Sequence, residues 1–240
     1  MEKFKVAVIG LGGVAQLVHL PILKKMPEVS VVAAAELNKN RLKSVSEKFG
    51  ITHIYTDYIQ MLNECDADAI IIATPTSSHS EIAKECIARK KNILIEKPIA
   101  RSYSEAKEIV DLAAKNKVNI MVGMNMRYRP DIMLLKSIAN SGEIGELFYV
   151  KAGWLKKQSS QSKWFTDKEK SGGGVILDLG IVLLDLSLWL LNFPEINSVS
   201  THNFSHLTNS VEDSSISKIR CQNNSLIFLE SSWSIGSDKD

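Results

Sequence analysis

The sequence predicts an α/β protein in which a doubly wound parallel sheet is followed by a smaller domain with an open, mainly antiparallel sheet. In the first half, short apolar runs alternate with segments of helical period, which is typical of a parallel sheet covered by helices on both faces. In the second half, three strand-like runs follow one another with short turns, which favours antiparallel pairing. We place the boundary near Gly123, so the predicted domains are residues 1–123 and 124–240.

Apolar runs rich in Val, Ile and Ala are the predicted strands of the first domain: Phe4–Ile9, Val29–Ala35, Ala69–Ala73, Asn92–Glu96 and Asn119–Gly123. The helices predicted between them are Arg41–Phe49, Ser80–Arg89 and Ser104–Asn116, the last with a capping box formed by Ser102 and Glu105. The second domain is predicted to contain a helix opened by Arg129-Pro130, a strand at Leu147–Lys156, an apolar helix at Val175–Leu191, and strands at Ile196–Asn203, Ser214–Cys221 and Ser225–Trp233.

Composition narrows the class of protein. The chain has 240 residues, of which 45% are hydrophobic and 23% charged, with a net charge of +2. These values are ordinary for a soluble globular protein, and they give no reason to expect a nucleic-acid partner. The apolar run after Lys5 is too short for a signal peptide, so we expect a cytoplasmic protein. Three scattered cysteines predict reduced thiols and no metal site: Cys65, Cys86 and Cys221.

A glycine-rich turn, Gly10–Ala15 (GLGGVA), directly follows the first predicted strand. Strand, glycine turn and helix in this order form the G-x-G-x-x-G/A pattern of a dinucleotide-binding turn. A pyrophosphate can approach the backbone only where no side chain intervenes, and the N–H groups of the following helix then face its charge. We expect Gly10, Gly12, Gly13 and Val14 to contact a dinucleotide, although glycine turns after strands are also common without a ligand.

An acidic residue, Glu36, ends the second strand 24 residues after Gly12. A carboxylate at this place can accept both ribose hydroxyls of an adenosine and would repel a 2′-phosphate, which favours NAD over NADP. Lys39 and Arg41 are close enough in sequence to leave NADP open. The alternative is a solvated acid at a strand end.

Polar residues also follow the third long strand. Thr74 and the rigid Pro75 are predicted to line the nucleotide, with His79 beside them. The alternative is purely structural: Ser77 or Ser78 would cap the next helix, and His79 would be a packing residue in its first turn.

The tripeptide Glu96-Lys97-Pro98 ends the fourth strand on the same sheet edge. Pro98 restricts Lys97 to extended geometry. A lysine that emerges from a buried strand toward a cleft can be partly desolvated, which lowers its pKa and makes it a candidate proton donor or acceptor. Taken alone, a Lys-Pro pair is more often a surface turn.

Two acids share one face of the apolar helix in the second domain. Asp178, Val182 and Asp185 have the i, i+4, i+7 spacing of such a face. Buried acids need partners, and these charges make the segment a core helix rather than a membrane span. Asp178 can alternatively complement the helix N-terminus. Asn125 and Arg127, after the fifth strand, either hold polar groups of a substrate or are solvated.

Taken in this order, the motifs resemble the Gfo/Idh/MocA oxidoreductase family over nearly the whole chain. The resemblance is carried by Gly10–Ala15, Glu36, Ala73–His79, Glu96-Lys97-Pro98, Val122-Gly123, Arg127, Gly172–Asp178 and Asp185. The Glu-Lys-Pro tripeptide is its most specific part. It implies an N-terminal Rossmann domain, a C-terminal α/β domain with an open sheet, and oxidation of a sugar or cyclitol hydroxyl, or reduction of the ketone, with NAD(P).

The resemblance also implies roles. Lys97 would contact substrate and cofactor, with Glu96 in the same cofactor-binding set, and Asp178 would complete the catalytic group. The family pattern has a histidine four residues after this aspartate, where this chain has Val182. Valine cannot move a proton, so Lys97 would take over that step. The rival hypothesis is a cofactor-binding regulator or sensor without dehydrogenase activity.

A second departure from the family pattern concerns length. The sequence ends shortly after Ser225–Trp233, whereas members of the family are longer, so the second sheet is expected to be incomplete. An open sheet invites association, and we expect a homo-oligomer formed through it. The predicted partner is otherwise a small polyhydroxylated substrate, with no nucleic acid and no membrane. A third reading is a nonfunctional fragment.

Overall fold

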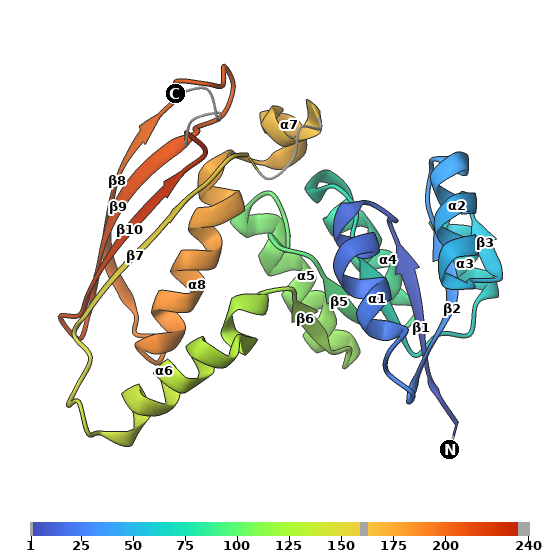
Figure 1. Ribbon diagram of the computed structural model, residues 1–240, viewed down its shortest axis with the longest axis horizontal. Coiled ribbons are helices and arrows are strands. Elements are labelled where there is room, and N and C mark those ends of the chain that lie inside the picture. The colour runs from blue at the N-terminus through green and yellow to red at the C-terminus, as the bar shows by residue number, and fades with distance from the viewer. Residues whose placement is uncertain (1, 159–162, 235–240) are drawn as a thin grey trace. The chain divides into compact units, whose positions relative to one another are not determined.

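The computed structural model describes residues 2–158 and 163–234 (Figure 1). The chain forms two compact units, residues 1–123 and 124–240, and each is described by itself.

The first unit is built on a six-stranded sheet of order β3-β2-β1-β4-β5-β6. Its strands are β1 (Phe4–Ile9), β2 (Val29–Ala35), β3 (His53–Tyr55), β4 (Ala69–Ile72), β5 (Asn92–Ile95) and β6 (Ile120–Val122). All neighbouring pairs are parallel. The strand order reverses between β1 and β4, and in such sheets ligands bind outside the carboxyl ends of the strands at this switch point. The predicted Rossmann-like fold is therefore confirmed.

Helices cover both faces of this sheet. They are the helical residues 13–23, which include α1 (Leu20–Leu23), and α2 (Lys39–Phe49), α3 (Tyr58–Glu64), α4 (His79–Ala88) and α5 (Tyr103–Asn116). Alternate residues of β1 point to opposite faces of the sheet and belong to two separate hydrophobic cores. Ala7 and Ile9 pack with α3, α4 and α5, whereas Val6 and Val8 pack with α1 and α2. Both faces of the sheet are thus apolar, which explains the continuous apolar runs in the sequence.

Side-chain caps set several helix starts. Asn38 accepts a 3.0 Å hydrogen bond from the Arg41 amide, and Ser102 accepts one of 3.3 Å from the Glu105 amide. The cap predicted at Ser77 or Ser78 is wrong. Ser78 precedes α4 without a side-chain cap bond, and its hydroxyl oxygen lies 2.8 Å from Thr74 Oγ1 and 2.9 Å from the Pro75 carbonyl oxygen.

The second unit contains a four-stranded sheet of order β7-β10-β9-β8. Its strands are β7 (Tyr149–Leu155), β8 (Ile196–Phe204), β9 (Ser214–Cys221) and β10 (Leu226–Ser232). β9 is antiparallel to β8 and β10, while β7 is parallel to β10, so the sheet is mainly antiparallel, as predicted. The helices are α6 (Pro130–Ser141), α7 (Lys168–Ser171) and α8 (Ile181–Leu190).

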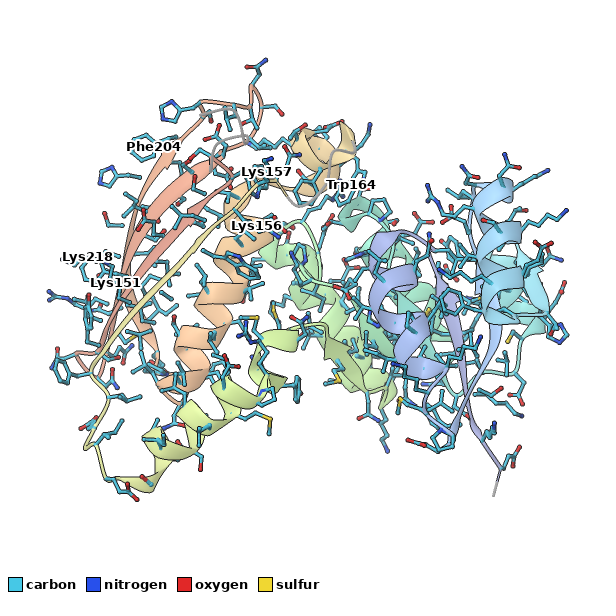
Figure 2. All side chains as sticks on the ribbon, in the orientation of Figure 1. Lys151, Lys156, Lys157, Trp164, Phe204 and Lys218 are labelled. Atoms are coloured by element: carbon cyan, nitrogen blue, oxygen red, sulfur yellow. The ribbon has the colours of Figure 1, made fainter. Side chains whose placement is uncertain are left out.

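Helix α8 packs on one face of this sheet, with Leu183 against Ile219, Ile227 and Leu229 (Figure 1). Figure 2 shows Lys151 and Lys218 on the opposite face, pointing away from α8. Among the described residues, one helical stretch, Lys168–Leu190, is long and apolar enough to cross a membrane by length and composition, and 56% of its apolar window is buried. We interpret its α8 part as a core helix because it covers the sheet.

Candidate functional site

The carboxyl ends of β1 and β4 touch at Gly10. This residue has φ +90°, and a Cβ atom built on it would lie 2.6 Å from the Ala73 carbonyl oxygen and 2.9 Å from Thr74 Cγ2. No side chain fits there, and the positive φ adds strain for any L-residue. Glycine at this position therefore lets the strand end and the loop after β4 approach each other.

The next two glycines have a different role. A Cβ atom on Gly12 or Gly13 would meet no described protein atom within 4 Å. The described part of the fold does not require glycine at these positions, so their bare backbone faces open space at the start of the helical residues 13–23. Val14 lies in the first turn of that helix. This arrangement fits a pyrophosphate, which needs close access to the backbone and free N–H groups at a helix start.

Glu36 leaves the end of β2 and turns toward the glycine turn. Its Oε2 accepts a 3.0 Å hydrogen bond from the Leu11 amide, and its Oε1 accepts one of 2.9 Å from the Asn38 amide. Arg41 Nη1 lies 3.3 Å from Oε2, with 45% of its side chain exposed. A carboxylate has about four lone-pair sites. At least one remains for a ribose hydroxyl, and a second is available if Arg41 moves away.

His79 is buried beneath the same edge of the sheet, with 1% of its surface exposed. Its Nδ1 lies 2.9 Å from the Pro98 carbonyl oxygen and its Nε2 lies 2.9 Å from the Thr74 carbonyl oxygen. Burial lowers the pKa of His79. Both ring nitrogens face backbone carbonyl oxygens, and a neutral imidazole donates to one of the two, so His79 ties the start of α4 to the loop after β4 or β5. The structural alternative from the sequence describes it better than a direct contact with a cofactor.

Lys97 follows the end of β5 and is half-buried. The Lys97–Pro98 peptide bond is cis. The preceding Glu96 is bound by a residue that sequence reasoning missed: His19 Nε2 lies 2.7 Å from Glu96 Oε1. The only sequence signal for this contact is a lone histidine in the helix after the glycine turn, which says nothing about a partner 77 positions away.

Asp178 lies in the second unit, in a single π-helical turn, Ile176–Gly180, directly before α8. Its side chain is buried, with 6% exposed, and its Oδ2 accepts a 3.0 Å hydrogen bond from Trp233 Nε1. π-Helical turns are frequent at functional sites. Only glycine fits at position 174, which precedes this turn, because a Cβ atom there would collide with the Glu212 carbonyl oxygen. Trp233 is a second residue that sequence reasoning missed.

The other acid of the helix, Asp185, is paired with Arg127. Arg127 Nε donates a 2.7 Å hydrogen bond to Asp185 Oδ2, and Nη2 donates to Oδ1. The guanidinium also lies over the ring of Phe193 at 5.1 Å. The pair raises the pKa of Arg127. Two of its five N–H donors are used, so a substrate contact through the others stays a prediction. Asn125 is exposed, and Val182 is buried with 5% exposed.

The described residues contain no cluster of three or more His, Cys, Asp or Glu side chains that could hold a metal ion. The three cysteines are free, with Cys86 and Cys221 buried and Cys65 half-buried. Burial raises the pKa of the Cys86 thiol to about 12. This thiol is therefore uncharged at neutral pH and is no candidate nucleophile.

Comparison with known protein families gives two matches along the chain. Residues 4–124 match the model described as the oxidoreductase family with an NAD-binding Rossmann fold. Residues 132–240 match the model of the GFO/IDH/MocA C-terminal domain. The two matches correspond to the two units of the structure.

Individual relatives agree with these matches. The chain is 28% identical to D-glucoside 3-dehydrogenase of Escherichia coli, covering 98% of this chain and 71% of the relative. It is 30% identical to scyllo-inositol 2-dehydrogenase (NAD(+)) of Bacillus subtilis, covering 84% of this chain and 57% of the relative. For other curated relatives the covered share of the relative is close to one half.

Solved structures also resemble this chain. GenD2 from gentamicin A biosynthesis, in complex with NAD, superposes with a TM-score of 0.93 at 26% identity, covering 99% of this chain and 68% of that one. An oxidoreductase from Agrobacterium radiobacter in complex with NAD+, L-tartaric acid and magnesium has a TM-score of 0.88 at 25% identity, covering 99% of this chain and 69% of that one.

Proposed function

Because the chain belongs to the Gfo/Idh/MocA oxidoreductase family, we propose that it transfers a hydride between NAD and a hydroxyl or ketone group of a sugar or cyclitol. The observation that carries the proposal is the position of Lys97. It follows the carboxyl end of β5, on the same sheet edge as the glycine turn after β1. The names of the relatives, which act on glucosides and inositols, support this class of substrate.

The residues of the first unit have distinct tasks in this proposal. When bound, NAD+ would supply the hydride acceptor for oxidation, and NADH would supply the hydride donor for reduction. Gly12 and Gly13 leave room for the pyrophosphate, and Glu36 accepts hydrogen bonds from the adenosine ribose. Lys97 Nζ takes the proton of the substrate hydroxyl during oxidation and returns it during reduction.

The second unit would supply the substrate contacts. We assign Asp178 to orienting the substrate or the lysine, and Asn125 and Arg127 to polar groups of the substrate. Val182 stands where the family pattern has a histidine, so Lys97 carries the proton step without that base. Loss of a general base typically costs about 10²–10⁴-fold in rate, and we therefore expect slow turnover.

The test is NADH formation, followed at 340 nm, with D-glucose, a methyl glucoside, D-glucose 6-phosphate, myo-inositol and scyllo-inositol. We expect turnover on at least one of these, lowered about 10²–10⁴-fold by Lys97→Met. Lys115→Met is the matched control, because Lys115 is exposed on α5. Equal turnover of Lys97→Met and wild type on every accepted substrate would refute the role of Lys97.

A cofactor-binding regulator is the second candidate function, and Val182 is the observation that favours it. Tight NADH binding without turnover on any polyol would support this candidate. The relatives and structures described above favour the oxidoreductase. The two functions are separated by pairing an NADH fluorescence titration with the substrate screen.

We also propose that the protein is cytoplasmic and forms a homo-oligomer through the open face of the second sheet. Lys151 and Lys218 lie on the face away from α8 (Figure 2). Because side chains alternate along a strand, Tyr149 and Leu155 share the face of Lys151 on β7, and Ile216 shares that of Lys218 on β9. These three apolar residues are 46%, 45% and 49% exposed. Exposed apolar side chains grouped on one sheet face are typical of an interface. Sedimentation velocity of wild type and Ile216→Glu tests this: we expect the variant to sediment as a monomer, and a monomeric wild type would contradict the proposal.

A further inference from the structure

One polar contact joins the helix after the glycine turn to the strand end that carries Lys97. His19 is the last residue of a π-helical turn, Ala15–His19. Its Nε2 lies 2.7 Å from Glu96 Oε1, and the two side chains are only 14% and 16% exposed. In a partly buried place such a contact is stronger than on the surface, because water competes less for either group.

The second oxygen of Glu96 is held from two other sides. Oε2 accepts a 3.3 Å hydrogen bond from the backbone N–H of Lys97. It also lies against Gly123, where a Cβ atom would approach it to 3.2 Å. The carboxylate is thus enclosed by the ends of β5 and β6, and His19 supplies the contact to its other oxygen. If that contact is lost, the carboxylate is free to rotate away from the Lys97 amide.

We propose that His19 is a positioning residue that sets the orientation of Lys97 through Glu96. The proposal rests on the proposed function, since it deepens the role given to Lys97. The π-helical turn supports it: one extra residue in a turn rotates the following side chains by about 100°. His19 is the last residue of this turn, and its Nε2 meets Glu96 at the end of β5. The helix that begins at the proposed pyrophosphate site, Gly12 and Gly13, therefore also fixes the position of the lysine.

The contact predicts which substitutions preserve the function. Because Nε2 is the atom that meets Glu96, a glutamine can place its amide N–H at nearly the same position, whereas an asparagine is one methylene too short. Phenylalanine keeps the volume of the ring without a donor. His19→Gln should therefore keep the turnover that His19→Asn and His19→Phe lose. The control is His53→Phe, since His53 is exposed on β3.

The experiment measures kcat, KM and NADH affinity on the best substrate of the screen, together with the ¹³C NMR signal of Lys97 after reductive methylation, assigned by its absence in Lys97→Met. For His19→Phe and His19→Asn we expect kcat to fall about 10- to 100-fold, since a misplacement of about 1 Å can cost about 100-fold. We expect NADH affinity and KM to change less than about threefold, and the Lys97 signal to shift. His19→Gln should stay close to wild type in all four measurements.

Three results would overturn the proposal: an unchanged kcat in His19→Asn, a Lys97 signal that does not move, or NADH affinity that falls in step with kcat. The last would mean that His19 only supports the cofactor site. Should His19→Phe fail to fold, the matched pair His19→Asn and His19→Gln still decides. If wild type turns over no polyol, the proposed function fails, while the NMR signal continues to report on the placement of Lys97.

Discussion

Trp233 Nε1 donates a 3.0 Å hydrogen bond to Asp178 Oδ2, and both side chains are buried. The ring of Phe165 lies 5.4 Å from that of Trp233, and the ring of Trp164 lies 5.2 Å from that of Phe165. A chain of aromatic side chains thus leads from the 3₁₀ turn Lys163–Thr166, which precedes α7, to the buried carboxylate. Asp178 is held by a donor from the far end of the described chain.

Replacing Trp233 with phenylalanine removes this donor and keeps much of the ring. A hydrogen bond to a charged group typically contributes about 1.5–3 kcal/mol, so we expect the free energy of unfolding to fall by about that amount. Turnover should fall as well if Asp178 orients the substrate. Urea denaturation and the polyol assay measure the two effects. Trp154→Phe is the control in the same unit, and equal effects of the two substitutions would contradict a specific role for the hydrogen bond.

Arg127→Lys distinguishes a structural role of Arg127 from substrate binding. Lysine keeps the charge but cannot make the two-pronged contact with Asp185, and it loses the planar group over Phe193. We expect a loss of about 1–3 kcal/mol in the free energy of unfolding, discounted from the value for a fully buried pair because 29% of the Arg127 side chain is exposed.

The control for this pair is Arg129→Lys, since Arg129 and Asp131 form a surface ion pair. We expect that variant to unfold like wild type. A raised KM in Arg127→Lys without any loss of stability would assign Arg127 to the substrate instead.

Glu36→Ser should change the preference between the two nicotinamide cofactors. The substitution removes the carboxylate that would repel a 2′-phosphate and releases Arg41, which now lies 3.3 Å from it. Because like charges at a binding interface cost several kcal/mol, we expect the NADP-to-NAD affinity ratio to rise at least about tenfold. Fluorescence titrations with NADH and NADPH measure the ratio. An unchanged ratio would mean that Glu36 does not face the ribose.

His79 makes stability depend on pH. Burial lowers its pKa in the folded chain, so below about pH 6.5 the unfolded chain binds a proton that the folded chain refuses. Stability should therefore be full above pH 6.5 and fall as the pH is lowered, by at most about 1.4 kcal/mol per pH unit. Unfolding free energies at pH 7 and pH 5 should show this loss in wild type and a smaller one in His79→Gln. His53→Gln should behave like wild type, and an equal pH dependence in all three proteins would contradict the assignment.

Local sequence patterns predicted most of the fold because the strands are continuous apolar runs. The predicted strands Phe4–Ile9, Val29–Ala35 and Ser214–Cys221 match β1, β2 and β9 residue for residue. β3 was not predicted, because three residues that are mostly exposed carry no period. α3 was missed as well, because seven residues hold barely two helical turns.

The candidate site also contains residues that the sequence predicted and residues that it did not. The glycine turn, Glu36 and Lys97 each follow a recognisable strand, so their shared edge can be inferred from the order of strands and helices along the chain. The partners His19 and Trp233 could not be inferred, because they meet Glu96 and Asp178 across 77 and 55 positions. The sequence suggested that buried acids in the apolar helix need partners, and the structure supplies Trp233 and Arg127.

The most direct test of the account is an NADH titration of wild type and Gly12→Ala, followed by NADH fluorescence. Alanine fits at position 12 without touching any described protein atom within 4 Å, so the variant should fold and melt like wild type. Its methyl group would occupy the space left for the pyrophosphate. We predict saturable binding by wild type and a loss of at least about tenfold in affinity for the variant, because one steric conflict of about 1.4 kcal/mol suffices for that factor. Equal NADH affinity of the two proteins, or no binding by wild type, would contradict a dinucleotide site at this turn.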